Sequence, residues 1–144
     1  DERAYEQAVT CYDRANLVLK DAQTTPLRGL AAGERAVCLA RSAELTGNLA
    51  VLDAAEAALK TELLTLQPRR DPAAWAVVQL HLARLYEARL DITGKDRGER
   101  AAAVTSLEAA LDVFGEHGLR SLTIVASDAL DRLKAGPAPR RTAV

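Results

Sequence analysis

Residues 4–15 read AYEQAVTCYDRA, in which a small residue, Ala8, is followed four positions later by Tyr12 and three positions after that by another small residue. The pattern is a small residue, then an aromatic residue or leucine, then a small residue. This spacing returns 47 residues later at Ala55, with one mismatch, and 48 residues later again at Ala103. A period in this range is typical of stacked helical hairpins. Such hairpins bury one apolar face against the next, and they leave a concave surface that usually holds another protein.

The composition favours a single all-α domain. The chain has 144 residues, of which 49% are hydrophobic and 27% charged, so it can bury a core without disulfides or metals. With one Phe, one Trp and three Tyr, that core has to come from alanine and aliphatic side chains at helical spacing. We expect one helical domain over residues 1–135 and an irregular tail over residues 136–144. Since the chain contains no Met, we also expect it to be part of a longer protein.

Helix start and stop signals divide the domain into about six helices. Pro26 and Pro72 suit the first turn of a helix, and Asn48 and Asp71 suit the N-cap position. Gly47 follows the second helix, where a glycine can end it. The expected helices span about residues 2–23, 26–46, 49–66, 72–93, 99–115 and 119–134.

The second expected helix carries small residues on its inward side. An interior glycine lowers helix stability by ~1 kcal/mol relative to alanine, so glycines here require close packing that compensates for them. We therefore expect this helix to lie at the crowded centre of the fold, and we expect leucine in place of Gly33 to overpack it. The inward residues are Gly29, Ala32, Gly33, Ala36, Ala40 and Ala43.

The fourth and fifth expected helices resemble the tetratricopeptide repeat (TPR) family. Leu82, Ala83 and Tyr86 match the leucine, small residue and tyrosine of the first helix of such a repeat, and the pattern that begins at Ala103 matches the second helix. Trp75 lies one helical turn upstream of its place in the motif, and the connection between the helices is longer than usual. The chain therefore resembles a degenerate, long-helix variant. The resemblance implies a right-handed stack of antiparallel helical hairpins, an α-solenoid, with a non-enzymatic, protein-binding role.

One face of the fourth expected helix is our candidate for the concave binding surface. It mixes apolar residues with charges, which is unusual for a face that meets only water. In the family the corresponding positions hold the bound peptide, and the guanidinium of Arg84 suits a carboxylate. Isolated apolar residues are also common on surfaces, and Arg84 could instead be a solvated charge beside Glu87. The candidate residues on this helix are Val77, Leu80, His81, Arg84 and Glu87. The other face, expected to form the core stripe, holds Trp75, Val78, Leu82, Leu85, Tyr86 and Leu90.

The sixth expected helix combines a core stripe with a polar outer face, a pattern typical of a terminal capping helix. Ile124 stands on the outer face among charged residues and completes the candidate protein-binding set. The expected core stripe consists of Leu119, Leu122, Val125, Ala129, Leu130 and Leu133.

The first expected helix suggests an alternative function, self-association. Its apolar side spans about half of the helix circumference, which is more than one neighbouring helix covers. In the family a preceding helix would cover Tyr5, Val9 and Tyr12, and here a second copy of the chain could supply that cover in a symmetric dimer. Two classes therefore stay open: a scaffold that binds a peptide or helix of another protein, and a dimerisation module of a larger protein.

Other residues give no indication of catalysis, a metal or a cofactor. The two histidines, His81 and His117, lie outside any spacing that would place metal ligands on one helix face. A net charge of −1 gives no electrostatic case for nucleic acid or for an anionic membrane. No stretch approaches the roughly 18 consecutive apolar residues of a membrane span. Cys11 and Cys38 suit small core positions in a reducing compartment. We expect a cytoplasmic protein that is not an enzyme and uses no cofactor.

Overall fold

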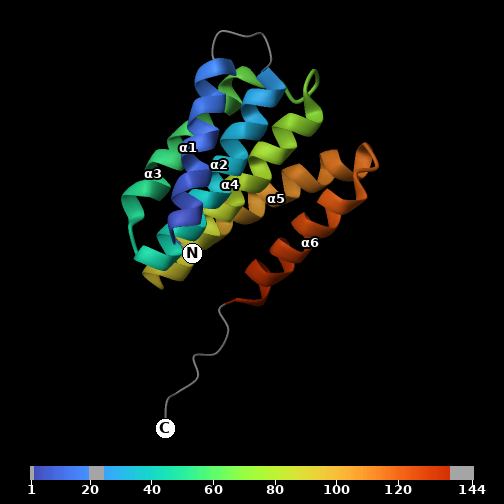
Figure 1. Cartoon of the computed structure of the whole chain (residues 1–144). Coiled ribbons are helices and arrows are strands. Elements are labelled where there is room, and N and C mark those ends of the chain that lie inside the picture. Colours follow the sequence, from blue (N-terminus) through green and yellow to red (C-terminus); the bar gives the residue numbers. More distant parts are fainter. Residues whose placement is uncertain (1, 20–24, 137–144) are drawn as a thin grey trace.

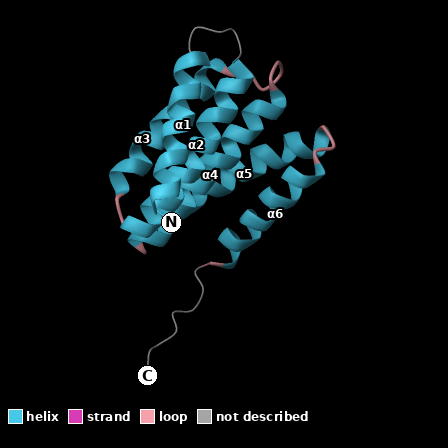
Figure 2. Ribbon diagram, in the orientation of Figure 1, coloured by secondary structure: helices cyan, strands magenta, loops and turns pink. Residues whose placement is uncertain are grey.

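The structure is a computed structural model that describes residues 2–19 and 25–136, with the backbone alone at residues 15–19 and 25–30. The described residues form six helices and no strand, which confirms the all-α class (Figures 1 and 2). The last residues of the first expected helix, 20–23, and the expected tail beyond residue 136 lie outside the described residues. The helices are α1 (Glu2–Leu19), α2 (Thr25–Thr46), α3 (Leu49–Thr65), α4 (Pro72–Thr93), α5 (Glu99–Glu116) and α6 (Arg120–Ala135).

The helix ends follow the signals in the sequence. The side chain of Asn48 accepts a hydrogen bond from the backbone N–H of Ala50 at 3.1 Å and caps α3 as expected. Asp71 occupies the N-cap position of α4, but its side chain makes no capping hydrogen bond and pairs with Arg70 at 3.1 Å instead. Gly94 ends α4 in the left-handed conformation, with a φ of 64° that favours glycine.

Helices α2 and α4 form the centre of the fold. Helix α2 packs against α1, α3 and α4, and α4 packs against α2, α3 and α5. Helix α6 packs against α5, and Figure 1 shows it set apart from α1, α2 and α3. The arrangement places the two helices with the most neighbours, α2 and α4, side by side.

Two clusters of buried side chains meet at α4. Val78 and Leu82 belong to the cluster that α4 shares with α2 and α3, whereas Ala83 belongs to the cluster that α4 shares with α5 and α6. Trp75 and Tyr86 pack against both clusters and join them. The centre of the expected core stripe is confirmed, since Val78 and Leu82 are fully or nearly fully buried.

The expectation that α2 is crowded is also confirmed. Its alanines on the inward side, Ala32, Ala36, Ala40 and Ala43, are buried, and so is Gly33. Side chains this small let the backbones of neighbouring helices approach closely. Gly29 lies outside the residues whose side chains are described.

Candidate functional site

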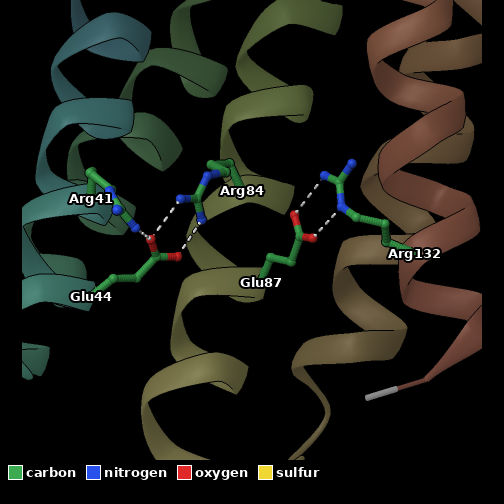
Figure 3. Close-up of polar contacts among 5 residues, drawn as sticks. All are labelled: Arg41, Glu44, Arg84, Glu87 and Arg132. Carbon is green, nitrogen blue, oxygen red and sulfur yellow. Dashed lines mark hydrogen bonds and ion pairs between the residues drawn. The ribbon is translucent and has the colours of Figure 1, made fainter. Parts of the chain in front are cut away.

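Charged side chains from α2, α4 and α6 come together on one side of the molecule, which we call the polar face (Figure 3). Two of the residues predicted to bind a partner, Arg84 and Glu87, lie on it. In Figure 3 each of these two points toward a different neighbouring helix and meets an opposite charge there. The polar face is defined by Arg41, Glu44, Arg84, Glu87 and Arg132.

Arg84 forms a two-point contact with Glu44 across the boundary between α4 and α2. Its Nη1 and Nη2 donate to the two carboxylate oxygens at 2.9 and 3.0 Å. Burial raises the pKa of the Glu44 carboxyl, but hydrogen bonds and charge from Arg84 and Arg41 outweigh it, and the net pKa is lowered. Arg84, expected to contact a carboxylate of a partner, thus pairs with a carboxylate of its own chain. Sequence reasoning missed Glu44 because it lies 40 residues away.

Glu87 makes the corresponding contact on the other side of α4. Its two carboxylate oxygens accept from Nε and Nη2 of Arg132 on α6 at 3.0 and 3.4 Å. The hydrogen bond to Glu87 raises the pKa of Arg132, and Asp128 and Asp91 raise it further through their charges. This pair therefore ties α6 to α4 from within an acidic neighbourhood.

His81 packs against α2 rather than toward a partner. A Cβ added at Gly33 would lie 2.7 Å from Nε2 of His81 and closer still to Cδ2, so the ring fills the space that the glycine leaves. Burial lowers the pKa of His81 to about 4. The imidazole is therefore neutral near pH 7 and serves as a packing element between α2 and α4.

The apolar candidates fall into different environments. Val77 was expected on the binding face, but it is only 9% exposed and belongs to the core cluster beside α5, so it offers a partner almost no surface. Leu80 is partly buried and packs against the same cluster. Ile124 is 60% exposed on α6. These three positions do not form one continuous apolar strip.

Val125 corrects the expected core stripe of α6. It is 53% exposed, whereas its neighbour Ala126 is fully buried. Val125 precedes Arg132 by seven residues, which places both on the same side of the helix. Because Arg132 reaches Glu87, that side of α6 faces α4. An exposed valine thus extends the polar face along α6.

An open groove lies beside the polar face, between the C-terminal ends of α4 and α6. It has a volume of about 820 Å³. Its lining comes from α4 and the loop that follows within residues 87–96, from Arg100 of α5, and from Arg132, Leu133, Ala135 and Gly136. Leu90 contributes apolar surface, and Glu87 and Arg132 belong to both the groove and the polar face. We call this feature the α4–α6 groove.

The residues predicted for self-association lie partly against α2. Tyr5, Val9 and Tyr12 are all half-buried, and Val9 packs against the core. Burial raises the pKa of Tyr12, and nearby Glu34 and Cys38 of α2 raise it further. These contacts supply, within one chain, part of the cover that the sequence assigned to a second copy.

The described part of the chain contains no group of three or more His, Cys, Asp or Glu side chains that could hold a metal ion. Cys11, which was expected at a core position, is exposed on α1, and Cys38 is half-buried on α2. Within the described residues, no helix is both long and apolar enough to cross a membrane.

Comparisons with protein-family models, with curated proteins and with solved structures find no match to this chain. The resemblance to tetratricopeptide repeats therefore depends on the quoted residues alone.

Proposed function

We propose that this chain is a non-catalytic interaction module that binds a peptide or helix of another protein. The observation that carries the proposal is the α4–α6 groove, which shares Glu87 and Arg132 with the polar face. The exposed Val125 lies two helical turns before Arg132 on the same side of α6. The partner contacts the surface of α2, α4 and α6 that does not pack against other helices of the chain.

The shape of the groove favours a peptide over a small molecule. Sites for small molecules enclose most of the ligand surface, whereas this groove is open to solvent along one side. An open groove between two helices suits an extended segment or an amphipathic helix, which needs to bury only one face. The apolar surface of Leu90 and the charges around it provide both kinds of contact.

The packing order supports a TPR-like arrangement as part of the same proposal. Each helix from α1 to α6 packs against the next, and α2 also packs against α4. In a stack of antiparallel hairpins, alternate helices line one surface. Under this proposal α2, α4 and α6 are those helices, and their shared surface carries Arg84 and Glu87.

Self-association through α1 is the alternative function. It needs Tyr5, Val9 and Tyr12 to offer apolar surface to a second copy. Because all three are half-buried, less of that surface is free than the sequence predicts. We therefore place the partner site on α4 and α6.

Site-specific photo-crosslinking in a native lysate tests the proposal. A photoreactive amino acid at Val125 is compared with the same amino acid at Leu64, which is 87% exposed on α3. We expect a discrete crosslinked partner from position 125 and none from position 64. Equal crosslinking from both positions, or none from position 125, would contradict the proposed site.

Val125→Arg and Leu64→Arg form the matched pair for affinity capture. Both positions are solvent-exposed, so neither substitution buries a charge. We expect only Val125→Arg to reduce capture of the crosslinked partner. Loss with both variants would indicate a general effect of the added charge and would count against the site.

A further inference from the structure

Most charged side chains around the α4–α6 groove pair with one another, and among the described residues Asp91, Asp128 and Lys95 do not. Glu44 pairs with Arg84, and Glu87 pairs with Arg132. Asp91 and Asp128 have neither a hydrogen bond nor an ion pair to their carboxylates among the described residues. Asp91 lines the groove one helical turn after Glu87, and Asp128 lies one turn before Arg132. The lining as a whole is balanced, with carboxylates at Glu87, Asp91 and Asp96 and cations at Lys95, Arg100 and Arg132. At the end nearest Glu87, which we call the mouth, the carboxylate of Asp91 has no direct partner within the described part of the chain.

The environment of Asp91 disfavours its negative charge in the free protein. Burial raises its pKa, and the carboxylates of Glu44 and Glu87 raise it further. Arg84 and Arg132 oppose this effect, but each is already paired with another carboxylate. An added cation at this position would relieve the repulsion.

The end of the groove beside the loop that follows α4 has a different charge pattern. The carboxylate of Asp96 accepts hydrogen bonds from the backbone N–H groups of Gly98 and Arg100 at 2.9 and 3.3 Å, and it also pairs with the Arg100 side chain. Lys95 lines the same end. A positively charged group of a bound partner is thus favoured at the end of the groove beside Asp91. It is disfavoured at the other end, beside Lys95.

Apolar surface lies next to the unpaired carboxylate. Leu90 directly precedes Asp91 and is partly buried, and Leu133 of α6 is almost fully buried in the wall of the groove. Lysine and arginine match such a site because their methylene stems cover apolar surface while their charged ends remain near water and anions.

We infer that the α4–α6 groove binds a basic segment of a partner protein, with a lysine or arginine stem over Leu90 and its charged end against Asp91. This inference rests on the proposed function, since it specifies the chemistry of the segment that the module binds. Asp128 adds to the attraction from the α6 side.

A selection of random linear peptides displayed on phage against the immobilised protein tests the inference. Asp91→Asn removes the charge at nearly constant shape. Asp112→Asn on α5 is the matched control, because Asp112 is exposed and lies outside the groove lining. Binding of each selected peptide is then measured by fluorescence anisotropy at low and high salt.

We expect the selected peptides to contain lysine or arginine, to bind Asp91→Asn about tenfold more weakly and to bind Asp112→Asn unchanged. We also expect their affinity to fall with added salt, since partly exposed charges are screened. Thermal unfolding of Asp91→Asn should not occur at a lower temperature than in the wild type, because the substitution removes a repulsive charge. Weaker binding then reflects the lost contact and not a lost fold.

Two results would overturn the inference in distinguishable ways. If the peptides compete for the groove but lack basic residues or ignore Asp91→Asn, the basic chemistry is wrong and the proposed function stands. If no peptide binds, or if all bind equally well to Val125→Arg and Asp91→Lys, both the inference and the proposed groove site are wrong.

Discussion

The imidazole of His81 on α4 occupies the place beside Gly33 of α2 where any other residue would carry its Cβ. A Cβ at position 33 would lie 2.7 Å from Nε2 of the ring, far inside van der Waals contact. Gly33 is a helix-interior glycine, so it lowers the intrinsic stability of α2. The contact shows what offsets that loss: the absent side chain lets α4 approach α2 with the ring between them.

Gly33→Ala should therefore destabilise the protein, although alanine is the better helix former. The helix itself gains ~1 kcal/mol from the substitution. Overpacking of a filled space typically costs about 1–3 kcal/mol, and the added Cβ would lie within 3.0 Å of two atoms of the His81 ring. We expect a net loss in the free energy of unfolding, measured by urea denaturation with circular dichroism. The larger Gly33→Leu change should have a greater effect in the same direction.

The His81→Ala background provides the control. Once the ring is gone, a Cβ at position 33 loses the neighbour with which it would clash, so Gly33→Ala should become neutral or stabilising there. If Gly33→Ala has the same effect in both backgrounds, the two residues do not interact and the packing argument is wrong.

His81 should also make the fold sensitive to mild acid. Burial lowers its pKa from 6.5 to about 4, so the unfolded state binds a proton at a higher pH than the folded state does. The contribution of the buried, neutral His81 to the free energy of unfolding is complete above pH 6.5. It is lost as the pH falls toward 4. A shift of one pKa unit corresponds to about 1.4 kcal/mol, so acidification from about pH 7 to about pH 5 should cost roughly 2 kcal/mol at this site.

The measurement compares the wild type with His81→Gln, whose side chain does not titrate. Urea denaturation at both pH values gives the free energy of unfolding for each protein. The difference between the two proteins should shrink, or change sign in favour of His81→Gln, as the pH falls. A difference that is constant with pH would show that His81 titrates normally in the folded state.

The pair Arg84–Glu44 should contribute more to stability than the pair Arg89–Asp53. Glu44 is 14% exposed and binds Arg84 through both carboxylate oxygens, whereas Asp53 is 68% exposed and binds Arg89 through one. We expect Arg84→Gln to cost about 1–2 kcal/mol, because it leaves a half-buried carboxylate with fewer partners. Arg89→Gln should cost no more than about 0.5 kcal/mol, as is usual for an exposed pair.

The two arginines lie on the same helix, so helix propensity is matched between these variants. Their free energies of unfolding should also respond differently to salt. Added salt should weaken the Arg89–Asp53 pair more than the Arg84–Glu44 pair. Equal losses for the two variants at low salt would mean that burial does not distinguish the pairs.

The sequence predicts the helices of this chain well and the neighbours of each side chain poorly. Asn48, Pro72 and Gly94 act within a few residues of their own positions, so the local sequence is enough to locate the helix ends they make. Arg84 was expected to contact a carboxylate of a partner, and in the structure it pairs with the carboxylate of Glu44 on another helix. A helical wheel shows which side chains of one helix share a face. It contains no information about which other helix packs against that face.

Rotation of a helix about its axis is a further limit on prediction. The core stripe of α6 was expected to include Val125, yet the small Ala126 is buried and Val125 is exposed. A small residue lets two helices pack closely, so it can occupy the centre of a contact that hydropathy assigns to a larger neighbour. The same effect operates on α2, where buried alanines and Gly33 form the contact surface.

Substitution of Tyr5 and Tyr12 separates self-association from packing within one chain. Both rings are half-buried, and Tyr12 lies near Glu34 of α2, so Tyr5→Glu with Tyr12→Glu adds repulsion and removes aromatic contacts. We expect the wild type to have the mass of one chain by size-exclusion chromatography with light scattering. The double variant should then keep that mass and unfold at a lower temperature. The double Tyr→Phe variant preserves the rings and should change little. A wild-type mass of two chains that the glutamate variant reduces to one would show instead that α1 forms the dimer contact.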